Sequence, residues 1–437
     1  MRAILLALAL FATADQARAQ SLTPAEQTIV TTVAAEHDRS IALLERLVNQ
    51  NSGTLNLVGV LAVGQMVAAE LEPLGFDVRW ADMAETDRAG HLIATRQGPG
   101  PNILLIGHLD TVFEPDSPFQ TFSRATADDG MDEGKGPGAV DNKGGLVVMI
   151  SALRAMAAAG TLDDANITIV LSGDEERPGV PLSVSRRDLV EAGEVATYAL
   201  ELEGMPSPDG HDLGIIGRRG VASWTLTTTG RAGHSSAVFD DQLGYGAIYE
   251  MSRILDAFRR DLREPALTYN VGFIAGGTSA TMDGEGFSAT VSGKTNIVAG
   301  TAVARGDIRA QTPEQDARVR VRMMEIVAEH LPGTGAELVF ADDAYLPMAP
   351  RAENRELLAQ LNAVNRDLGL PQMDESDPSV GGASDVGFVA ARVPSLAGRG
   401  AAGWGMHSDG ETVDLGSLVR QAQRAAILIG RLSAQPR

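Results

Sequence analysis

The chain contains no cysteine, and it has far fewer basic residues than acidic ones. The lack of cysteine excludes disulfides, thiolate metal sites and a cysteine nucleophile. Lys and Arg number 36 against 57 Asp and Glu, which gives a formal net charge of -21, and no basic run interrupts the acidic surplus. A surface of that sign repels nucleic-acid phosphates and anionic lipid. We therefore expect no nucleic-acid partner.

Long hydrophobic runs are also scarce. The apolar block at residues 3–12 follows Arg2 and precedes Ala17, Arg18 and Ala19, which is the order of a secretory signal peptide. The block is too short to cross a bilayer as a helix. We expect residues 1–19 to be a cleaved signal peptide and the mature protein to be secreted, into the periplasm if the cell is bacterial. A buried N-terminal helix is the alternative. We expect no membrane contact after signal cleavage, because no later segment is long and apolar enough to span one.

What is present is the composition of a globular protein. The 437 residues are 44% hydrophobic and 21% charged, and this length predicts two or three domains. Residues 103–106 and 167–171 are short apolar runs, typical of strands buried on both faces. Residues 28–49, 56–74 and 144–159 have the apolar spacing of helices. Strands that alternate with helices in this way predict an α/β fold with a mostly parallel sheet.

The pattern changes after Gly217. Residues 221–229 alternate apolar and polar side chains, as a half-buried strand does. Up to residue 342 the order strand–helix–strand–strand–helix–strand is that of a ferredoxin-like α+β domain. We therefore predict an insert at 217–342 that divides a larger α/β domain into a first part, 20–216, and a second part, 343–437.

Metal-binding residue types follow the predicted strands of the larger domain. The motifs are GHLDT (107–111), GAVDNKGG (138–145), GDEE (173–176), LELEG (200–204) and MHSDG (406–410). The carboxyl ends of parallel strands meet at one edge of a sheet, where ligands bind. Each motif alone also fits a solvated loop. A phosphate-binding loop at 136–145 is excluded, because the P-loop spacing is missing and Asp141 would repel phosphate. A bound cation would instead relieve the repulsion among these acids.

Taken in order, the five motifs closely resemble the signature of one family of zinc-dependent co-catalytic metallopeptidases. It includes glutamate carboxypeptidase, aminoacylase-1, peptidase T and succinyl-diaminopimelate desuccinylase. The similarity covers nearly the whole mature chain and is greatest to the exported glutamate carboxypeptidase branch. It implies a dizinc exopeptidase catalytic domain, α/β with a mostly parallel sheet, and an inserted ferredoxin-like dimerisation (lid) domain. It also implies a homodimer.

The resemblance implies two Zn²⁺ ions per subunit, with Co²⁺ or Mn²⁺ as alternatives. It assigns Asp141 to both ions as a bridge. His108 and Glu203 complete one ion site, and Glu176 and His407 complete the other. Glu201, on the same strand, is the alternative to Glu203.

Further roles follow from the same resemblance. Glu175 is the general base and acid, and Asp110 orients His108. The peptide bond between Asp141 and Asn142 is expected to be cis.

The substrate contacts are also expected from the resemblance. His234, in GRAGHSS, is expected to stabilise the oxyanion from the partner subunit. Arg309 and Asn296 are assigned to substrate binding, since a guanidinium pairs well with a carboxylate. The turn at 381–385 is expected to line the site. Arg399 is a further candidate, with a solvated loop arginine as its alternative.

These assignments predict a hydrolase that cleaves an amide or peptide bond next to a free carboxylate, through water activated by two zinc ions. Its substrates would be small peptides or N-acyl amino acids, so that it would be a carboxypeptidase or an N-acyl-amino-acid hydrolase. The alternatives are a dipeptidase or desuccinylase of the same family, or a metal-free binding module. Intact residues at all five ligand positions weigh against the binding module.

Overall fold

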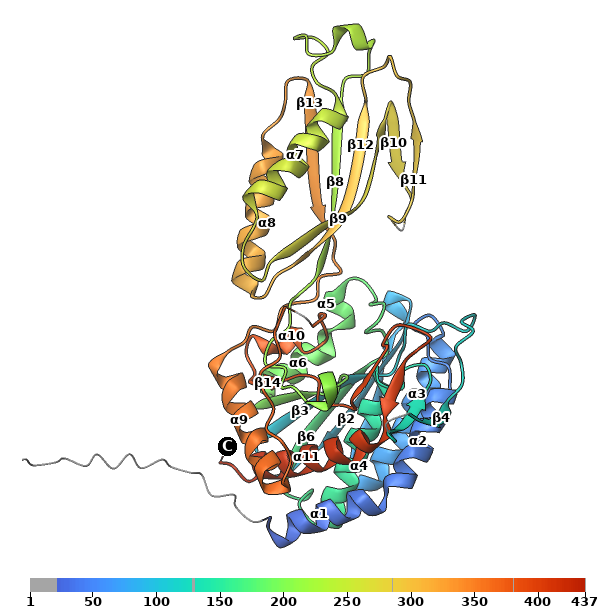
Figure 1. Ribbon diagram of the computed structural model, residues 1–437, viewed down its shortest axis with the longest axis vertical. Helices are drawn as coiled ribbons and strands as arrows, with labels where there is room; N and C mark the ends of the chain where they lie inside the picture. Colours follow the sequence, from blue (N-terminus) through green and yellow to red (C-terminus); the bar gives the residue numbers. More distant parts are fainter. Residues whose placement is uncertain (1–21, 128–129, 285, 380, 437) are drawn as a thin grey trace, which may run out of the picture.

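The computed structural model of the protein describes residues 22–127, 130–284, 286–379 and 381–436. The predicted signal peptide at 1–19 lies outside the described residues. Figure 1 shows two layered units, one above the other. Two chain segments connect them and pair with each other, through antiparallel bridges from Arg218 to Met348 and from Val221 to Tyr345.

A six-stranded sheet forms the centre of the lower unit. Its strands are β1 (Asp77–Met83), β2 (Arg88–Arg96), β3 (Asn102–His108), β6 (Asn166–Ser172), β7 (Tyr198–Glu201) and β14 (Ser395–Leu396). Their order across the sheet is β1-β2-β6-β3-β7-β14. Neighbours from β6 to β14 are parallel, and β2 is antiparallel to both of its neighbours. The prediction of a mostly parallel sheet is confirmed.

Helices cover both faces of this sheet (Figure 1). They are α1 (Pro24–Ala35), α2 (His37–Asn49), α3 (Leu57–Leu71), α4 (Lys143–Ala158), α5 (Leu182–Ser185), α6 (Arg187–Val195), α9 (Ala352–Leu368), α10 (Gly387–Ala390) and α11 (Leu415–Ser433). Ile103 and Leu105 of β3 pack in the larger core with α1 to α4, α9 and α11. Leu104 and Ile106 pack on the opposite face, in the core that includes α6 and α10. A strand that is buried on both faces reads as a continuous apolar run.

The predicted helix at 28–49 is two helices. The chain breaks at Glu36, where φ is -92° and ψ is 10°. Buried residues continue at helical spacing across the break, from Val33 in α1 to Ile41 in α2. The apolar pattern therefore does not reveal where the first helix ends.

One later segment is, by length and composition, apolar enough to cross a membrane, contrary to the sequence-based expectation. It is Leu57–Leu74, which contains α3. In the fold, α3 buries Val60, Val63, Val67 and Leu71 in the larger core.

The upper unit is a second sheet with two helices on one face (Figure 1). Its strands are β8 (Ala222–Gly230), β9 (Thr268–Gly277), β12 (Thr301–Arg309) and β13 (Thr334–Phe340), and its helices are α7 (Ala247–Asp261) and α8 (Pro313–Ala328). The order β13-β8-β12-β9, antiparallel throughout, is that of a ferredoxin-like fold. Trp224, Phe258 and Met323 lie in its separate core. A hairpin of β10 (Ser279–Met282) and β11 (Ala289–Ser292) extends the loop between β9 and β12.

A small antiparallel sheet lies beside the main one, and the sequence analysis did not predict it. Its strands are β4 (Ser123–Thr126), β5 (Asp132–Lys135), β15 (Gly403–Trp404) and β16 (Thr412–Asp414), in the order β15-β16-β5-β4. These strands have two to four residues, too few for an alternating pattern to be visible. The turn between β15 and β16 carries His407.

Candidate metal centre

The site forms where three neighbouring parallel strands end. His108 is the last residue of β3 and lies opposite Ser172, the last residue of β6. Glu201 ends β7 on the other side of β3, and Glu203 follows two residues later. The carboxyl edge of the sheet thus gathers residues that are far apart in the sequence, as ligand sites of open α/β sheets do.

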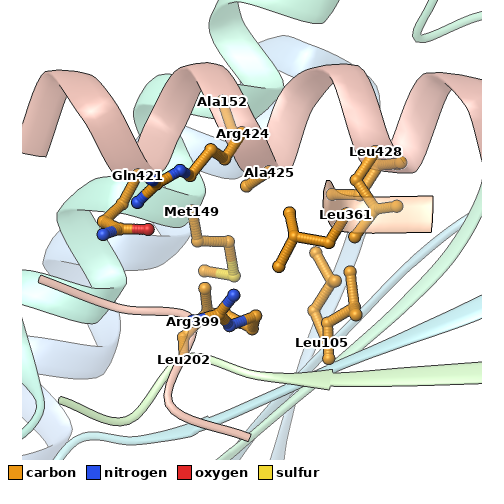
Figure 2. Close-up of a pocket in the computed structure, with 12 residues that line it drawn as sticks. Leu105, Met149, Ala152, Leu202, Leu361, Arg399, Gln421, Arg424, Ala425 and Leu428 are labelled. Atoms are coloured by element: carbon orange, nitrogen blue, oxygen red, sulfur yellow. The ribbon is translucent and has the colours of Figure 1, made fainter. Parts of the chain in front are cut away.

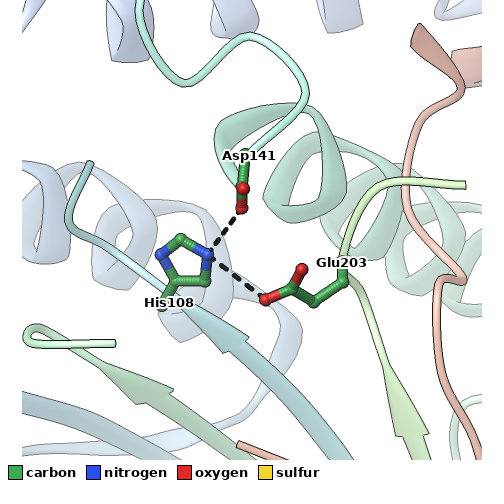
Figure 3. Close-up of side chains that lie close together, drawn as sticks. All are labelled: His108, Asp141 and Glu203. Carbon is green, nitrogen blue, oxygen red and sulfur yellow. Dashed lines mark hydrogen bonds and ion pairs between the residues drawn. The ribbon is translucent and has the colours of Figure 1, made fainter. Parts of the chain in front are cut away.

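The first group of possible metal ligands is His108, Asp141 and Glu203 (Figure 3). His108 Nε2 lies 2.9 Å from Asp141 Oδ1 and 3.5 Å from Glu203 Oε1. All three side chains are buried. Glu201 is not in this group: its Oε1 accepts a hydrogen bond from the backbone N–H of Val386.

The second group is Asp141, Glu176 and His407. His407 Nε2 lies 3.2 Å from Asp141 Oδ2 and 3.1 Å from Glu176 Oε2. Asp141 therefore belongs to both groups, with Oδ1 toward His108 and Oδ2 toward His407. In each group the ligand atoms lie within 4.8 Å of one another.

Burial and mutual hydrogen bonds shift the pKa values of the candidate ligands. Burial raises the pKa of Glu176 to about 7 even though His407 lies beside it. Hydrogen bonds to Asp141 and Glu176 raise the pKa of His407 to about 10. Burial by itself would lower the pKa of His108, but hydrogen bonds to Asp110, Asp141 and Glu203 raise it. Protons on these groups are the competitors that a metal ion displaces on binding.

The residues present fit a divalent metal. Glu176 Oε1 is buried and has no hydrogen-bond partner, which is costly unless a cation satisfies it. Imidazole nitrogens and carboxylate oxygens, with no thiolate, suit Zn²⁺ and related transition ions.

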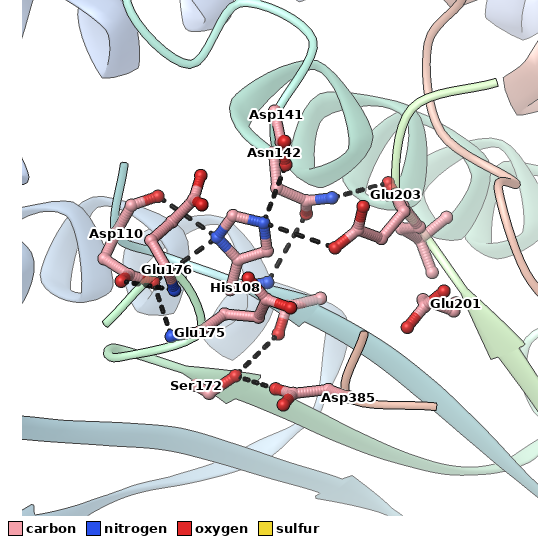
Figure 4. Close-up of polar contacts among 12 residues, drawn as sticks. His108, Asp110, Asp141, Asn142, Ser172, Glu175, Glu176, Glu201, Glu203 and Asp385 are labelled. Atoms are coloured by element: carbon pink, nitrogen blue, oxygen red, sulfur yellow. Dashed lines mark hydrogen bonds and ion pairs between the residues drawn. The ribbon is translucent and has the colours of Figure 1, made fainter. Parts of the chain in front are cut away.

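Asp110 connects several parts of the site and lies beside His108 (Figure 4). Its Oδ1 lies 3.3 Å from His108 Nδ1, on the side of the ring away from Asp141. The backbone N–H groups of Glu175 and Glu176 also donate to its carboxylate, at 3.0 and 3.1 Å. Thr54 Oγ1 donates to it at 2.6 Å. Asp110 thus fixes both the imidazole and the loop that carries the two glutamates.

The Asp141 loop is held by Glu411, which the sequence analysis did not single out. Its carboxylate accepts hydrogen bonds from the backbone N–H groups of Gly138, Val140 and Asp141, at 2.8 to 3.0 Å. The Asp141–Asn142 peptide bond is cis, as the family resemblance implied. The only sequence signal for Glu411 is its place four residues after His407.

Two acids of the predicted motifs serve other contacts. Asp174, the first acid of GDEE, lies 2.6 Å from Arg186 Nη1. Asp385 lies 2.7 Å from Arg186 Nε. Both carboxylates are buried, and both form ion pairs with Arg186. Glu175 faces the cavity instead, and burial together with the charge of Glu203 raises its pKa well above the usual range.

A cavity of about 390 Å³ opens above the ligands. Glu175, Glu176, Glu203 and His407 line it, with Gly381, Gly382 and Ala383 of the predicted turn. Arg218 also lines it, and its guanidinium lies 3.7 Å from Glu201 and 3.6 Å from Glu203. The sequence analysis missed Arg218, because a single arginine at the start of the predicted insert carries no pattern.

Arg309 lines an adjoining cavity of about 400 Å³. Glu175 and His407 line both cavities. Arg309 Nε lies 2.9 Å from Asp307. His234 and Asn296 lie elsewhere in the insert, where Asn296 O accepts from Ser235 N–H at 2.9 Å. Neither His234 nor Asn296 lines these two cavities. One chain thus brings the five ligands, Glu175, Asp110 and Arg309 to one region, and leaves His234 and Asn296 apart.

Both readings of Arg399, a further substrate contact and a loop arginine exposed to solvent, are wrong. Its side chain is buried, and it lines an internal cavity of the lower unit rather than the metal centre (Figure 2). The Gly-rich sequence around it gave no sign of burial, because the helices that cover it come from distant parts of the chain.

A parallel-sheet domain whose strand ends hold two carboxylate–histidine groups around a shared aspartate defines a metal-dependent hydrolase. The chain belongs to peptidase family M20/M25/M40, whose family model matches residues 104–431. It is a metallopeptidase, and it hydrolyses amide bonds with the help of bound metal.

Relatives and solved structures agree with this assignment. The chain is 28% identical over 410 residues to carboxypeptidase G2 of Pseudomonas sp. (strain RS-16), covering 91% of this chain and 90% of that one. It is 27% identical over 374 residues to succinyl-diaminopimelate desuccinylase of Acidiphilium cryptum (strain JF-5), covering 84% and 92%. Its fold matches a tripeptidase of Staphylococcus aureus with a TM-score of 0.68 at 19% identity, covering 91% and 99%. An M20 family metallo-carboxypeptidase of Sulfolobus solfataricus matches with a TM-score of 0.60 at 15% identity, covering 91% and 100%.

Proposed function

We propose that the protein is an exported dizinc carboxypeptidase or N-acyl-amino-acid hydrolase that removes an amino acid with a free carboxylate. One observation carries the metal part of the proposal: the two oxygens of Asp141 face two different histidines, His108 and His407. A bridging carboxylate is what two neighbouring cations need, and each group adds one further glutamate.

The metal ions, when bound, supply Lewis acidity for water and for the scissile carbonyl. Glu175 lines the cavity beside both ligand groups and is positioned to take the proton of the attacking water. Its raised proton affinity suits a base that later returns the proton to the leaving amine. Asp110 holds His108 in the orientation that presents Nε2 to the ion.

Two arginines are candidates for binding the carboxylate of the substrate. Arg309 reaches the cleft from β12, and Arg218 lines the deeper cavity. A guanidinium binds a carboxylate through two parallel hydrogen bonds. Arg218 already faces Glu201 and Glu203, whereas Arg309 is half-exposed and pairs only with Asp307 among the ion pairs of the described chain. We assign substrate carboxylate binding to Arg309, with Asn296 of the partner subunit as a second contact.

The homodimer is part of the same proposal. His234 and Asn296 do not line the cavities of their own chain, so they are assigned to the site of the partner subunit. Near His234 in sequence, Phe239 and Tyr249 are each 53% exposed, and their rings contact each other and Tyr245 in tilted or edge-on arrangements. An exposed aromatic cluster of this kind is typical of a surface that another protein chain covers.

Export is proposed from residues 1–19 alone. The test is N-terminal sequencing of the protein from the periplasmic fraction of cells that express the full chain. Cleavage after Ala19 is expected, and an intact N-terminus in the cytoplasm would contradict export.

The reaction is tested with matched substrates. N-acyl amino acids, dipeptides and N-succinyl-diaminopimelate are each offered with a free carboxylate and as the corresponding amide. We expect hydrolysis of the free acids, at least about 10²-fold slower turnover of the amides, loss of activity with a chelator, and recovery with Zn²⁺. Preference for the succinyl substrate would favour the desuccinylase alternative. Equal rates on acids and amides would contradict carboxylate recognition.

A further inference from the structure

The segment that returns from the upper unit to the lower one passes close to the metal centre. Tyr345 lies on this segment and pairs with Val221 of the outgoing connection. Each backbone N–H donates to the carbonyl of the other residue, at 2.9 and 3.0 Å. Tyr345 is only 8% exposed, and it lines the cavity that contains Arg309. A buried tyrosine is thus fixed where the two units join, beside the cleft.

The hydroxyl group of Tyr345 reaches the loop that carries the two glutamates. It donates to the backbone carbonyl of Glu175 at 2.7 Å, and it accepts from Arg186 Nη2 at 2.6 Å. Arginine can only donate and a carbonyl can only accept, so the direction of both hydrogen bonds is determined. The single hydroxyl proton of Tyr345 therefore points to the backbone of the residue assigned as the general base.

Arg186, which directs this hydroxyl, is itself held on several sides. Its guanidinium forms ion pairs with Asp174 and Asp385 at 2.6 and 2.7 Å, and Nη2 also donates to Asp174 O at 3.1 Å. It lies 5.5 Å from the centre of the Tyr345 ring and 5.8 Å from that of Phe388. Breaking a buried ion pair leaves a charge without compensation, which is costly. Arg186 is therefore a fixed support for the hydroxyl.

The backbone of Glu175 is held at both of its polar groups. Its N–H donates to Asp110 Oδ1 at 3.0 Å. Its carbonyl accepts from Tyr345, and within the described ranges no other hydrogen bond reaches that carbonyl. The peptide groups on the two sides of the Glu175 Cα atom are thus fixed by side chains from distant segments. Their placement sets the direction in which the Glu175 side chain leaves the backbone.

We propose that Tyr345 is a positioning residue for the general base: its hydroxyl, supported by Arg186, fixes the Glu175 backbone and so directs the carboxylate into the cavity. The inference rests on the proposed role of Glu175. A base must lie within hydrogen-bond reach of the proton that it takes. Because Tyr345 belongs to the connection between the units, the same contact ties the placement of the base to the position of the insert.

A direct role of the Tyr345 hydroxyl in proton transfer is disfavoured by the same contacts. Its proton is already donated to Glu175 O. Burial raises the pKa of Tyr345 well above its usual range, so the hydroxyl keeps that proton. Tyr345 therefore acts through Glu175 rather than on the substrate.

The test is Tyr345→Phe in the full chain. This change removes the hydroxyl and keeps the ring, whose centre lies 5.4 Å from that of Phe388. Steady-state kinetics are measured on the N-acyl amino acid that the wild-type protein hydrolyses fastest. We expect kcat to fall by about 10- to 10²-fold, as for a displaced catalytic group. KM should stay within about two-fold of wild type, because substrate binding is not altered, and zinc per subunit should not change.

The matched control is Tyr269→Phe in β9. The Tyr269 hydroxyl also donates to a backbone carbonyl, that of Phe258, at the same distance of 2.7 Å. Tyr269 lines neither cavity at the metal centre. Both variants lose one hydrogen bond of the same kind, so their melting temperatures should fall by similar amounts. Only Tyr345→Phe should lose kcat, which separates positioning from a purely structural role.

A double variant tests whether Tyr345 acts through Glu175. In the Glu175→Gln protein the base is absent, so adding Tyr345→Phe should lower the remaining activity by less than about two-fold. A wild-type kcat for Tyr345→Phe, an equal loss for Tyr269→Phe, or an undiminished effect in the Glu175→Gln protein would overturn the positioning role. An active Glu175→Gln protein would instead overturn the assignment of the base, so the two failures are distinguishable.

Discussion

Among single residues, Glu175 has the clearest expected effect. Glu175→Gln keeps the size of the side chain and removes the proton acceptor. Hydrolysis should fall by about 10²- to 10⁴-fold, while metal uptake, measured by elemental analysis, should not change because the five ligands remain. Glu191→Gln on the exposed side of α6 is the control. A Glu175 variant with most of its activity would refute the assignment of the base.

Asp212 gives a prediction about stability and pH. Burial alone would raise the pKa of Asp212, but the hydrogen bond from Arg424 and the charge of Arg420 lower it from 3.8 to about 2. Because the folded pKa is below the ordinary one, the ionised carboxylate stabilises the fold above about pH 4, and this contribution is lost as the pH falls through 2.

Asp212→Asn should therefore lower the free energy of unfolding at pH 7 by about 1–2 kcal/mol, after allowance for screening by solvent. Thermal denaturation of wild type and variant at pH 7 and at pH 3 measures the effect. The difference in stability between wild type and Asp212→Asn should be smaller at pH 3 than at pH 7. A difference of constant size would show that the charge of Asp212 contributes nothing.

At the scale of elements, α4 packs directly on the strand end that precedes Glu203. A Cβ atom at Gly145 would lie 1.8 Å from Leu202 O, so the backbone there must move. Gly145→Ala is expected to cost about 1–3 kcal/mol of stability and to weaken metal binding, since Glu203 follows Leu202. Chemical denaturation and metal titration measure the two effects.

The control for α4 is Gly430→Ala in α11, where nothing lies within 4 Å of an added Cβ. Alanine is the better helix former, so this variant should be neutral or more stable by up to about 1 kcal/mol. An equal change in stability for Gly145→Ala and Gly430→Ala would contradict a close-packed contact between α4 and the strand end.

The elements also show what the sequence can and cannot predict. Strand β3 was predictable because it is buried on both faces, and the amphipathic α7 because its pattern is periodic. The break at Glu36 and the small sheet around His407 were not, since neither changes the apolar spacing. Arg399, Arg218 and Glu411 were missed or misplaced for another reason: a single charged residue shows its partners only when distant segments come together.

For the whole molecule, the separation of His234 from the cavities of its own chain makes a testable claim about assembly. Mixing equal amounts of His234→Ala and Glu175→Gln chains should restore activity to roughly one quarter of the wild-type level, the statistical share of intact composite sites in a two-fold dimer. Each variant alone should be nearly inactive. Mixed chains that stay inactive, or a fully active monomer by sedimentation, would exclude His234 acting across subunits.

The central claim concerns the whole metal centre, in which one aspartate serves two ions. Chelator-stripped protein is reloaded with Zn²⁺, freed of excess metal and analysed for zinc per subunit, together with Asp141→Ala. The account predicts two equivalents bound by the wild-type protein and loss of both ions in the variant, because Oδ1 and Oδ2 belong to different groups. One equivalent or none in well-folded wild-type protein would contradict it.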